Sequence, residues 1–284
     1  MINESRELLG SEIRIIVVDD DAGSAVNEAF CECSRIEKTY SRFRDESELS
    51  KLNRSAGEWV TVSEEFFELI KFGEQMREKT DGAFDLTVKK ILESWGYDKN
   101  YSFEESRKAE LGRVEMGEDF QVRVFGEIDL GGIGKGFALD KMKSCLNEFK
   151  NFCINAGGDI FARGRDPEGE KWKIFFEHPM NLDEVIGFAE IDDFFAAASS
   201  GSKRKWRDKH HLVDTRSGAP AREMLAVYVQ SDSGISADAY ATALFVSGYE
   251  KAQQIAVENR IAVMLISPAG EIFRTENFKG ELFT

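Results

Sequence analysis

The stretch D-L-G-G-I-G-K-G, residues 129–136, lies between a predicted strand and a predicted helix. Closely spaced glycines let the backbone approach a ligand, and the N-terminus of a helix offers N–H donors to a phosphate group. The stretch is not a P-loop, because only two residues separate Gly131 from Gly134 and a glycine follows the lysine. It also lacks the G-x-G-x-x-G spacing of a dinucleotide-binding turn. Taken alone, it leaves nucleotide binding and a tight structural turn equally open.

Around this stretch, the apolar pattern predicts strands and helices that do not alternate as regular βαβ units. Strands are expected over residues 12–18, 122–124, 127–130, 152–155, 171–177, 185–191, 194–198, 224–230, 261–266 and 271–274. We expect 122–124 and 127–130 to form a hairpin, and 171–198 to form successive antiparallel strands. Helices are expected through residues 29, 36 and 40, over 64–79 and 86–94, after 136, and near 237–246 and 250–258. This mixture favours the α+β class.

Composition excludes several classes of protein. The chain has 284 residues, 42% hydrophobic and 31% charged, which supports a buried core in one large domain or two modest ones. No stretch approaches the ~20 consecutive apolar residues of a membrane helix. The opening residues are acidic and lack a basic n-region, so we expect a cytoplasmic protein without a secretory signal. A net charge of −15 argues against nucleic-acid binding and means that an anionic ligand needs local donors or a divalent cation.

Asp238 and Thr242 are four residues apart in a predicted helix, so their side chains share one face. A carboxylate and a hydroxyl are oxygen ligands of the kind that Mg²⁺ takes. However, Asp238 could equally cap the start of the helix, and Thr242 could bond back to its own helix. From these residues alone, the structural interpretation is favoured.

Three further segments have both a chemical and a structural interpretation. In H-H-L-V-D at residues 210–214, His211 and Asp214 could be an acid–base pair, although a surface histidine pair is commoner. The S-S-G segment at 199–201 could admit a ligand or form a plain turn. In D-G-A-F-D at 81–85, Phe84 could pack on a ring system or in the core.

The order of these motifs resembles that of the FAD:protein FMN transferase family, the ApbE-type flavin transferases. The motifs are S-x-L-x-x-L-N at 47–53, G-A-F-D at 82–85, W-G-Y at 95–97, D-L-G-G-I-G-K-G at 129–136, N-A-G-G-D at 155–159, S-G at 200–201, H-x-x-D at 211–214 and A-D-A-x-A-T at 237–242. The resemblance extends from about Leu9 to the last predicted hairpin. It implies one ApbE-like domain over residues 1–284, an α+β fold of mixed, largely antiparallel sheets with packed helices. That domain is either undivided or formed by two closely packed α/β lobes with the site between them.

The resemblance also implies an activity, which is Mg²⁺-dependent transfer of FMN from FAD to a Thr or Ser hydroxyl of an acceptor protein. A phosphodiester bond forms and AMP is released. The implied partner is an acceptor protein with a Thr/Ser flavinylation motif. The implied FAD contacts are Ala83, Phe84, Asp85, Asp129, Lys135, Asn155, Gly157, Gly158, Ser200, Gly201 and His211. The implied metal ligands are the Gly132 carbonyl, the Asp238 carboxylate, the Thr242 hydroxyl and, in addition, the Ala241 carbonyl.

Chemical reasoning assigns further roles within this set. The acceptor hydroxyl must lose a proton, and His211, oriented by Asp214, is our candidate base. Metal-bound water or Asp238 could play the same part. Lys135 and the N–H groups of residues 134–136 would supply positive potential to the diphosphate. Two other functions use the same residues: Mg²⁺-dependent hydrolysis of FAD to FMN and AMP, and FAD binding without catalysis.

The chain departs from the family pattern at three points. Leu9-Gly10-Ser11 stands where the family usually has Met-Gly-Thr, so the flavin contact of that methionine is in doubt. Asp214-Thr215 stands where Asp-Pro is usual. Family members are commonly exported lipoproteins, whereas we expect a cytoplasmic protein here.

Overall fold

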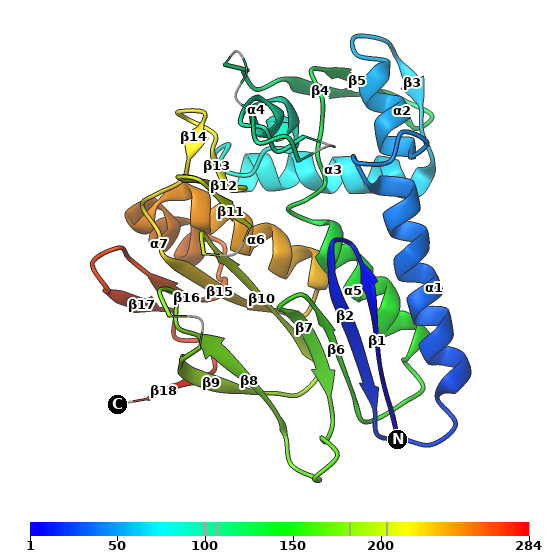
Figure 1. The fold of residues 1–284 in the computed structure, drawn as a ribbon, viewed down its shortest axis with the longest axis vertical. Coiled ribbons are helices and arrows are strands. Elements are labelled where there is room, and N and C mark those ends of the chain that lie inside the picture. Colours follow the sequence, from blue (N-terminus) through cyan, green and yellow to red (C-terminus); the bar gives the residue numbers. More distant parts are fainter. Residues whose placement is uncertain (99–100, 105, 107, 182, 203, 284) are drawn as a thin grey trace.

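The main sheet runs through the centre of the molecule, and its neighbouring strands are all antiparallel (Figure 1). The computed structural model describes residues 1–284 except 99–100, 105, 107, 182, 203 and 284. Within these residues the sheet has eight strands in the order β1-β2-β6-β7-β10-β15-β16-β17. Their bounds are Ile2–Leu8, Ser11–Val17, Phe152–Ala156, Asp159–Arg163, Phe194–Ser200, Ala226–Ser231, Ala262–Ile266 and Ile272–Arg274.

Helices cover one face of the main sheet. Side chains alternate between the faces of a strand, and in β10 Phe195 and Ala197 belong to the large core that the helices share. Phe194 and Ala196 of the same strand pack instead in a smaller cluster with Trp172. The helices of this layer are α1 (Gly23–Tyr40), α5 (Gly134–Cys145), α6 (Gly234–Ser247) and α7 (Tyr249–Glu258).

A small sheet lies on the other face. Its order is β18-β9-β8, with bounds Glu281–Leu282, Val185–Ile191 and Trp172–Glu177. Trp172 and Ile191 pack with residues of β7 and β10, and Phe176 packs with Met264 of β16. Two short ribbons, β11-β12 and β13-β14, follow β10 along the chain and have the bounds Lys205–Trp206, Lys209–His210, Val213–Asp214 and Ala219–Pro220.

The remaining elements gather at one end of the molecule, above the main sheet in Figure 1. They include a second small sheet of the order β3-β5-β4. Their bounds are α2 Glu48–Arg54, β3 Val60–Thr61, α3 Glu64–Lys79, the 3₁₀ turn η1 Leu86–Val88, α4 Lys89–Ser94, β4 Arg113–Met116 and β5 Gln121–Phe125. The expected α+β fold of largely antiparallel sheets with packed helices is therefore confirmed.

Helix α3 shows how local sequence determines an element. The Ser63 hydroxyl accepts a hydrogen bond from the Phe66 N–H at 3.3 Å, and Glu64 and Glu65 occupy the first turn, where negative charge suits the helix dipole. After the last turn, Gly82 has a φ of +76° and its N–H bonds the Arg77 carbonyl at 2.8 Å. The predicted bounds, 64–79, are those of the structure.

The predicted hairpin of 122–124 with 127–130 is wrong. Strand β5 pairs with β4 and β3, and residues 127–130 are not a strand. Their backbone groups have other partners: both the N–H and the carbonyl of Ile128 bond the Asn53 side chain, at 2.8 and 2.9 Å. Asp129 N–H bonds the Leu86 carbonyl at 2.7 Å. An alternating apolar pattern cannot reveal such distant partners.

Pairing of the strands between 171 and 200 also differs from the prediction. β8 and β9 are antiparallel neighbours, but β10 leaves them for the main sheet, where it pairs with β7 and β15. None of the helices in the described part of the chain has the length and apolar character needed to cross a membrane.

Candidate active site

A cavity of about 1270 Å³ opens where the start of α5, the middle of α6 and the turn between β6 and β7 meet the loops after α1, α3 and β10. Its volume exceeds the roughly 300–1,000 Å³ usual for small-molecule sites. Most residues singled out from the sequence line it, namely Ala83, Phe84, Asp85, Asp129, Gly132, Lys135, Asn155, Gly157, Gly158, Ser200, His211, Asp238 and Thr242. Segments far apart in the chain are thus brought to one site.

The glycines of 129–136 allow α5 and α6 to approach each other at this cavity. A Cβ on Gly136 would overlap the Gly234 carbonyl and would lie 2.8 Å from Asp238 Cβ. At this contact the Gly136 N–H donates to Asp238 Oδ2 at 2.9 Å. A Cβ on Gly132 would lie 3.4 Å from Thr242 Oγ1 and 3.0 Å from the Phe84 ring. The glycine segment therefore lies directly against the two oxygen-bearing side chains of α6.

Asp140 fixes the position of α6 relative to α5. From the second turn of α5, its carboxylate accepts hydrogen bonds from the Gly234 and Ile235 N–H groups at 2.8 and 2.9 Å. It thus satisfies N–H groups at the start of α6 that have no partner within the helix. Burial raises the pKa of Asp140, and these N–H donors oppose that rise. Asp238 and Thr242 are therefore presented on a helix that is held from its first turn.

Lys135 lies between two acids. Its ammonium pairs with Asp159 and lies 3.5 Å from Asp238 Oδ1. Burial alone would lower the pKa of Lys135, but the charges of Asp159 and Asp238 outweigh it, so the pKa is raised and the lysine stays charged. Burial raises the pKa of Asp159, against the effect of Lys135. Two carboxylates therefore share one ammonium, which leaves the cluster able to accept further positive charge.

His211 lies in the cavity wall as a half-buried, neutral imidazole. Its Nδ1 is buried and has no hydrogen-bond partner among the described residues. Burial, followed by the charges of Arg204 and other nearby groups, lowers the pKa of His211 to about 3. By contrast, both ring nitrogens of neighbouring His210 are bonded, to the Ala221 carbonyl and the Leu212 N–H. Of the two histidines, His211 is the one left free to act on a ligand.

Asp214 does not orient His211, which corrects the expectation from the sequence. It belongs to the β13-β14 turn, where its carboxylate accepts hydrogen bonds from Arg216 N–H at 3.0 Å and from Ser217 Oγ at 2.8 Å. Hydrogen bonds within the turn thus occupy the Asp214 carboxylate, which the H-x-x-D spacing had suggested as a partner of His211. Within the described residues, Asp214 does not line the cavity.

Gly201 and Ala241 also do not line the cavity, as far as the chain is described. A Cβ on Gly201 would lie 3.1 Å from the His210 ring, so this glycine makes room for His210. Ala241 is fully buried inside α6, where its carbonyl belongs to the helical hydrogen-bond ladder. Of the expected metal ligands, Ala241 is therefore the one that the geometry supports least.

Several predicted FAD contacts are held by their own neighbours. Asp85 caps the turn η1, because its Oδ1 accepts from Thr87 N–H at 2.7 Å, and its Oδ2 pairs with Arg77 at 3.0 Å. Asn155 Oδ1 accepts the Gly158 N–H at 2.9 Å and so shapes the β6–β7 turn. These bonds orient the side chains and backbone that face the cavity before any ligand arrives.

A sequence model of the ApbE family matches residues 9–265, which include every predicted site residue. This chain belongs to the ApbE family. The FAD:protein FMN transferase of Haemophilus influenzae is 26% identical to it over 98% of this chain and 88% of its own length. The crystal structure of the ApbE protein of Thermotoga maritima matches with a TM-score of 0.87 and 28% identity over 97% of each chain. The flavin transferase ApbE of Vibrio cholerae, at 22% identity over 98% of this chain and 97% of its own, has a TM-score of 0.85 and supports the fold.

The donors in this ApbE chain fit a magnesium ion better than a transition metal. The described residues contain no group of three or more His, Cys, Asp or Glu side chains able to hold a metal. The expected set has one carboxylate, one hydroxyl and backbone carbonyl oxygen, all hard ligands, and Mg²⁺ commonly completes such sets with water and substrate phosphate. The closeness of Gly132 to Thr242 and the charge of the Lys135 cluster agree with such an ion.

Sequence reasoning missed an aromatic and cationic wall of the cavity in this ApbE chain. The wall is lined by Arg42, Phe43, Tyr97, Tyr101, Phe103, Arg204 and Trp206. Tyr97 lies in the W-G-Y motif, whose local sequence indicates no role at a site. Arg42 and Phe43 lie shortly before the S-x-L-x-x-L-N motif, which begins at Ser47, and no local pattern indicates that Arg42 would meet Tyr97, 55 residues further on.

Proposed function

We propose that this chain transfers FMN from FAD to a Thr or Ser hydroxyl of an acceptor protein and releases AMP. One observation carries the proposal: the glycine segment, the Lys135 cluster, the α6 oxygen ligands and a neutral His211 converge on one cavity. Relatives over nearly the whole chain bear the name of this activity.

The reaction breaks a phosphoanhydride bond and forms a phosphoester bond. The acceptor oxygen attacks the phosphorus on the FMN side of the diphosphate, and the bond from that phosphorus to the bridging oxygen breaks. The bridging oxygen leaves with AMP, and the acceptor proton passes to a base. Negative charge therefore grows on the AMP phosphate while the phosphoryl group moves. The Lys135 ammonium, which lines the cavity, would offset part of this charge, and a divalent cation would supply the rest in an otherwise acidic protein.

Residues of α6 and the glycine segment would hold Mg²⁺. The ligands we propose are the Asp238 carboxylate, the Thr242 hydroxyl and the Gly132 carbonyl, with Ala241 as the weakest candidate. When bound, the ion would neutralise charge on the diphosphate and on the departing AMP. Gly136 N–H and Lys135 both contact Asp238, so they fix the carboxylate in place for this role.

His211 is the proposed base. Since its pKa is lowered to about 3, it is neutral at pH 7 and able to accept a proton. A base with so low a pKa is weak, but an anionic diphosphate bound beside the ring would raise the pKa. Substrate binding would thus strengthen the base at the moment it is needed. Asp214 has no part in this step.

The test uses the full chain with FAD, Mg²⁺ and a small acceptor protein that carries a flavinylation-type Thr motif. Intact-mass spectrometry should show a gain of one FMN moiety on the acceptor, abolished by EDTA and by Thr→Ala substitution in the acceptor. FMN and AMP in solution without an adduct would indicate hydrolysis of FAD instead. Bound but unchanged FAD would indicate a binding protein and would contradict the proposal.

A further inference from the structure

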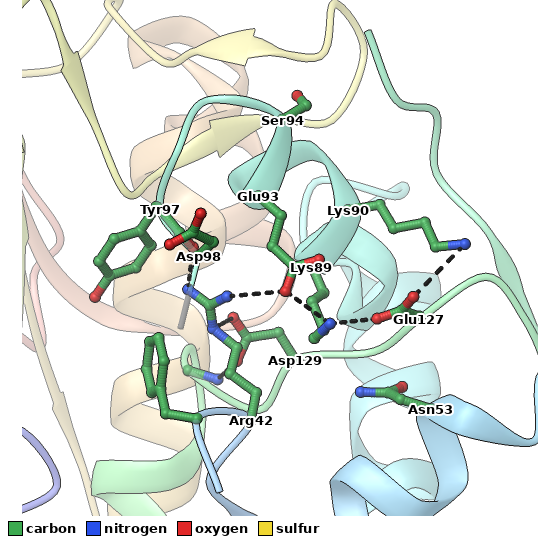
Figure 2. A network of polar contacts seen from close by, with 12 residues as sticks. Arg42, Asn53, Lys89, Lys90, Glu93, Ser94, Tyr97, Asp98, Glu127 and Asp129 are labelled. Carbon is green, nitrogen blue, oxygen red and sulfur yellow. Dashed lines mark hydrogen bonds and ion pairs between the residues drawn. The ribbon is translucent and has the colours of Figure 1, made fainter. Parts of the chain in front are cut away.

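Arg42 is a buried arginine that lines the cavity. Figure 2 shows the network of polar contacts around it. Arg42 is the second residue after α1, and its side chain is only 3% exposed. Its Nε lies 3.0 Å from Asp129 Oδ2, and its Nη2 donates to the Tyr97 carbonyl at 3.0 Å. One guanidinium therefore joins the end of α1 to the glycine segment and to the loop after α4.

The same guanidinium contacts two aromatic rings of the wall. Its Cζ lies 4.3 Å from the centroid of the Phe43 ring and 4.8 Å from that of Tyr97. Tyr97 in turn stacks on Trp206 at 5.1 Å, and Phe43 stacks on Tyr101 at 5.4 Å. Arg42 thus lies at the junction of both ring pairs, where a cation over aromatic faces is stabilising.

Opposite charges alternate from Arg42 toward the surface. Arg42 Nη1 is 4.0 Å from Glu93, Glu93 is 2.8 Å from Lys89, and Lys89 pairs with Glu127 (Figure 2). Lys89 is another largely buried cation of this network, but it does not line the cavity in the described part of the structure. The two cations share a network and differ in their access to the site.

The burial of Arg42 is not explained by its hydrogen bonds alone. Arg42 Nη1 is buried and has no hydrogen bond to any described residue. An unsatisfied buried donor destabilises a protein, and buried ion pairs are often no better than well-packed apolar residues. The contacts of Arg42 therefore point to a role at the cavity rather than to stability alone.

We propose that Arg42 is a positioning residue for FAD, which holds Asp129 and the Phe43–Tyr97 wall in the geometry that binds the dinucleotide. This inference rests on the proposed function, because it takes FAD as the ligand. Gly131 N–H holds one oxygen of Asp129 at 2.8 Å while Arg42 holds the other. Each carboxylate oxygen keeps a lone pair for a ligand donor. The arginine also neutralises a carboxylate that would otherwise repel an anionic ligand.

The test compares Arg42→Met with Lys89→Met. Each substitution removes one cation of the network and keeps an unbranched apolar stem. FAD affinity is measured by titration of flavin fluorescence without metal or acceptor, and visible circular dichroism reports the environment of the bound flavin. We expect Arg42→Met to weaken FAD binding at least about tenfold and to change the dichroism, while Lys89→Met binds within about twofold of wild type. With acceptor and Mg²⁺ present, KM for FAD should rise in Arg42→Met more than kcat falls.

Arg42→Lys serves as the second variant, and it decides the matter if Arg42→Met does not fold. It keeps the charge but loses the forked donors and the flat stacking surface. We expect an affinity between those of wild type and Arg42→Met. Equal affinity in wild type and a folded Arg42 variant would overturn the inference, as would equal losses in Arg42→Met and Lys89→Met. Failure of the wild type to bind FAD would instead contradict the proposed function itself.

Discussion

At the scale of single residues, His211 carries the most specific claim about chemistry. General-base catalysis typically contributes ~10²–10⁴-fold to a rate. We therefore expect His211→Asn to lower FMN transfer by about that factor while FAD still binds, as measured by flavin fluorescence and intact mass. Asp214→Asn is the matched control, because Asp214 faces its own turn and should leave transfer unchanged. Near-normal transfer by His211→Asn would place the base elsewhere.

The same residue predicts a dependence of stability on pH. The pKa of His211 is lowered from 6.5 to about 3, chiefly by burial, so the unfolded chain binds a proton that the folded chain does not. The free energy of unfolding should therefore fall as pH falls from about 6.5 to 3, by at most ~1.4 kcal/mol per pH unit for one proton. Urea denaturation of wild type and His211→Gln at several pH values measures this. The free energy of unfolding should depend more steeply on pH in the wild type than in His211→Gln. An equal dependence on pH in both proteins would refute the assigned environment of His211.

At the scale of elements, the contact between α5 and α6 holds the site together. A Cβ on Gly136 would overlap the Gly234 carbonyl, whereas a Cβ on Gly134 would meet nothing within 4 Å. Overpacking typically costs ~1–3 kcal/mol, and alanine is favoured over glycine in a helix by up to ~1 kcal/mol. We expect Gly136→Ala to lower the free energy of unfolding and Gly134→Ala to maintain or raise it, as measured by urea denaturation. Losses of similar size in both variants would contradict this close approach.

Elements specified by local chemistry could be predicted from the sequence. Helix α3 was predicted correctly, because Ser63, the acidic first turn and the helical spacing of the apolar residues all lie within one segment. The alternating pattern at 127–130 gave a wrong strand prediction. The backbone N–H and carbonyl of Ile128 bond the side chain of Asn53 in α2 and not a neighbouring strand. Strand β7 was not predicted either, because its buried and partly buried residues do not alternate strictly and the segment therefore lacks a clear strand pattern.

At the scale of the whole molecule, the order of motifs predicted the family and most of the cavity lining. The order of motifs could not predict which charged side chains would form ion pairs. Lys135 pairs with Asp159, 24 residues on, and Arg42 pairs with Asp129 from the end of another helix. Such contacts depend on the packing of several elements, and no local spacing encodes them. The number of lobes and the cytoplasmic location stay predictions of the sequence.

The most direct test of the central claim counts products. Wild-type protein, FAD, Mg²⁺ and the Thr-bearing acceptor are mixed, and AMP release and flavinylated acceptor are measured in the same samples over time. Transfer predicts one AMP for each FMN attached, at every time point, with no AMP formed when EDTA is added. AMP that accumulates while the acceptor stays unmodified would contradict the assignment of this cavity as a transferase site.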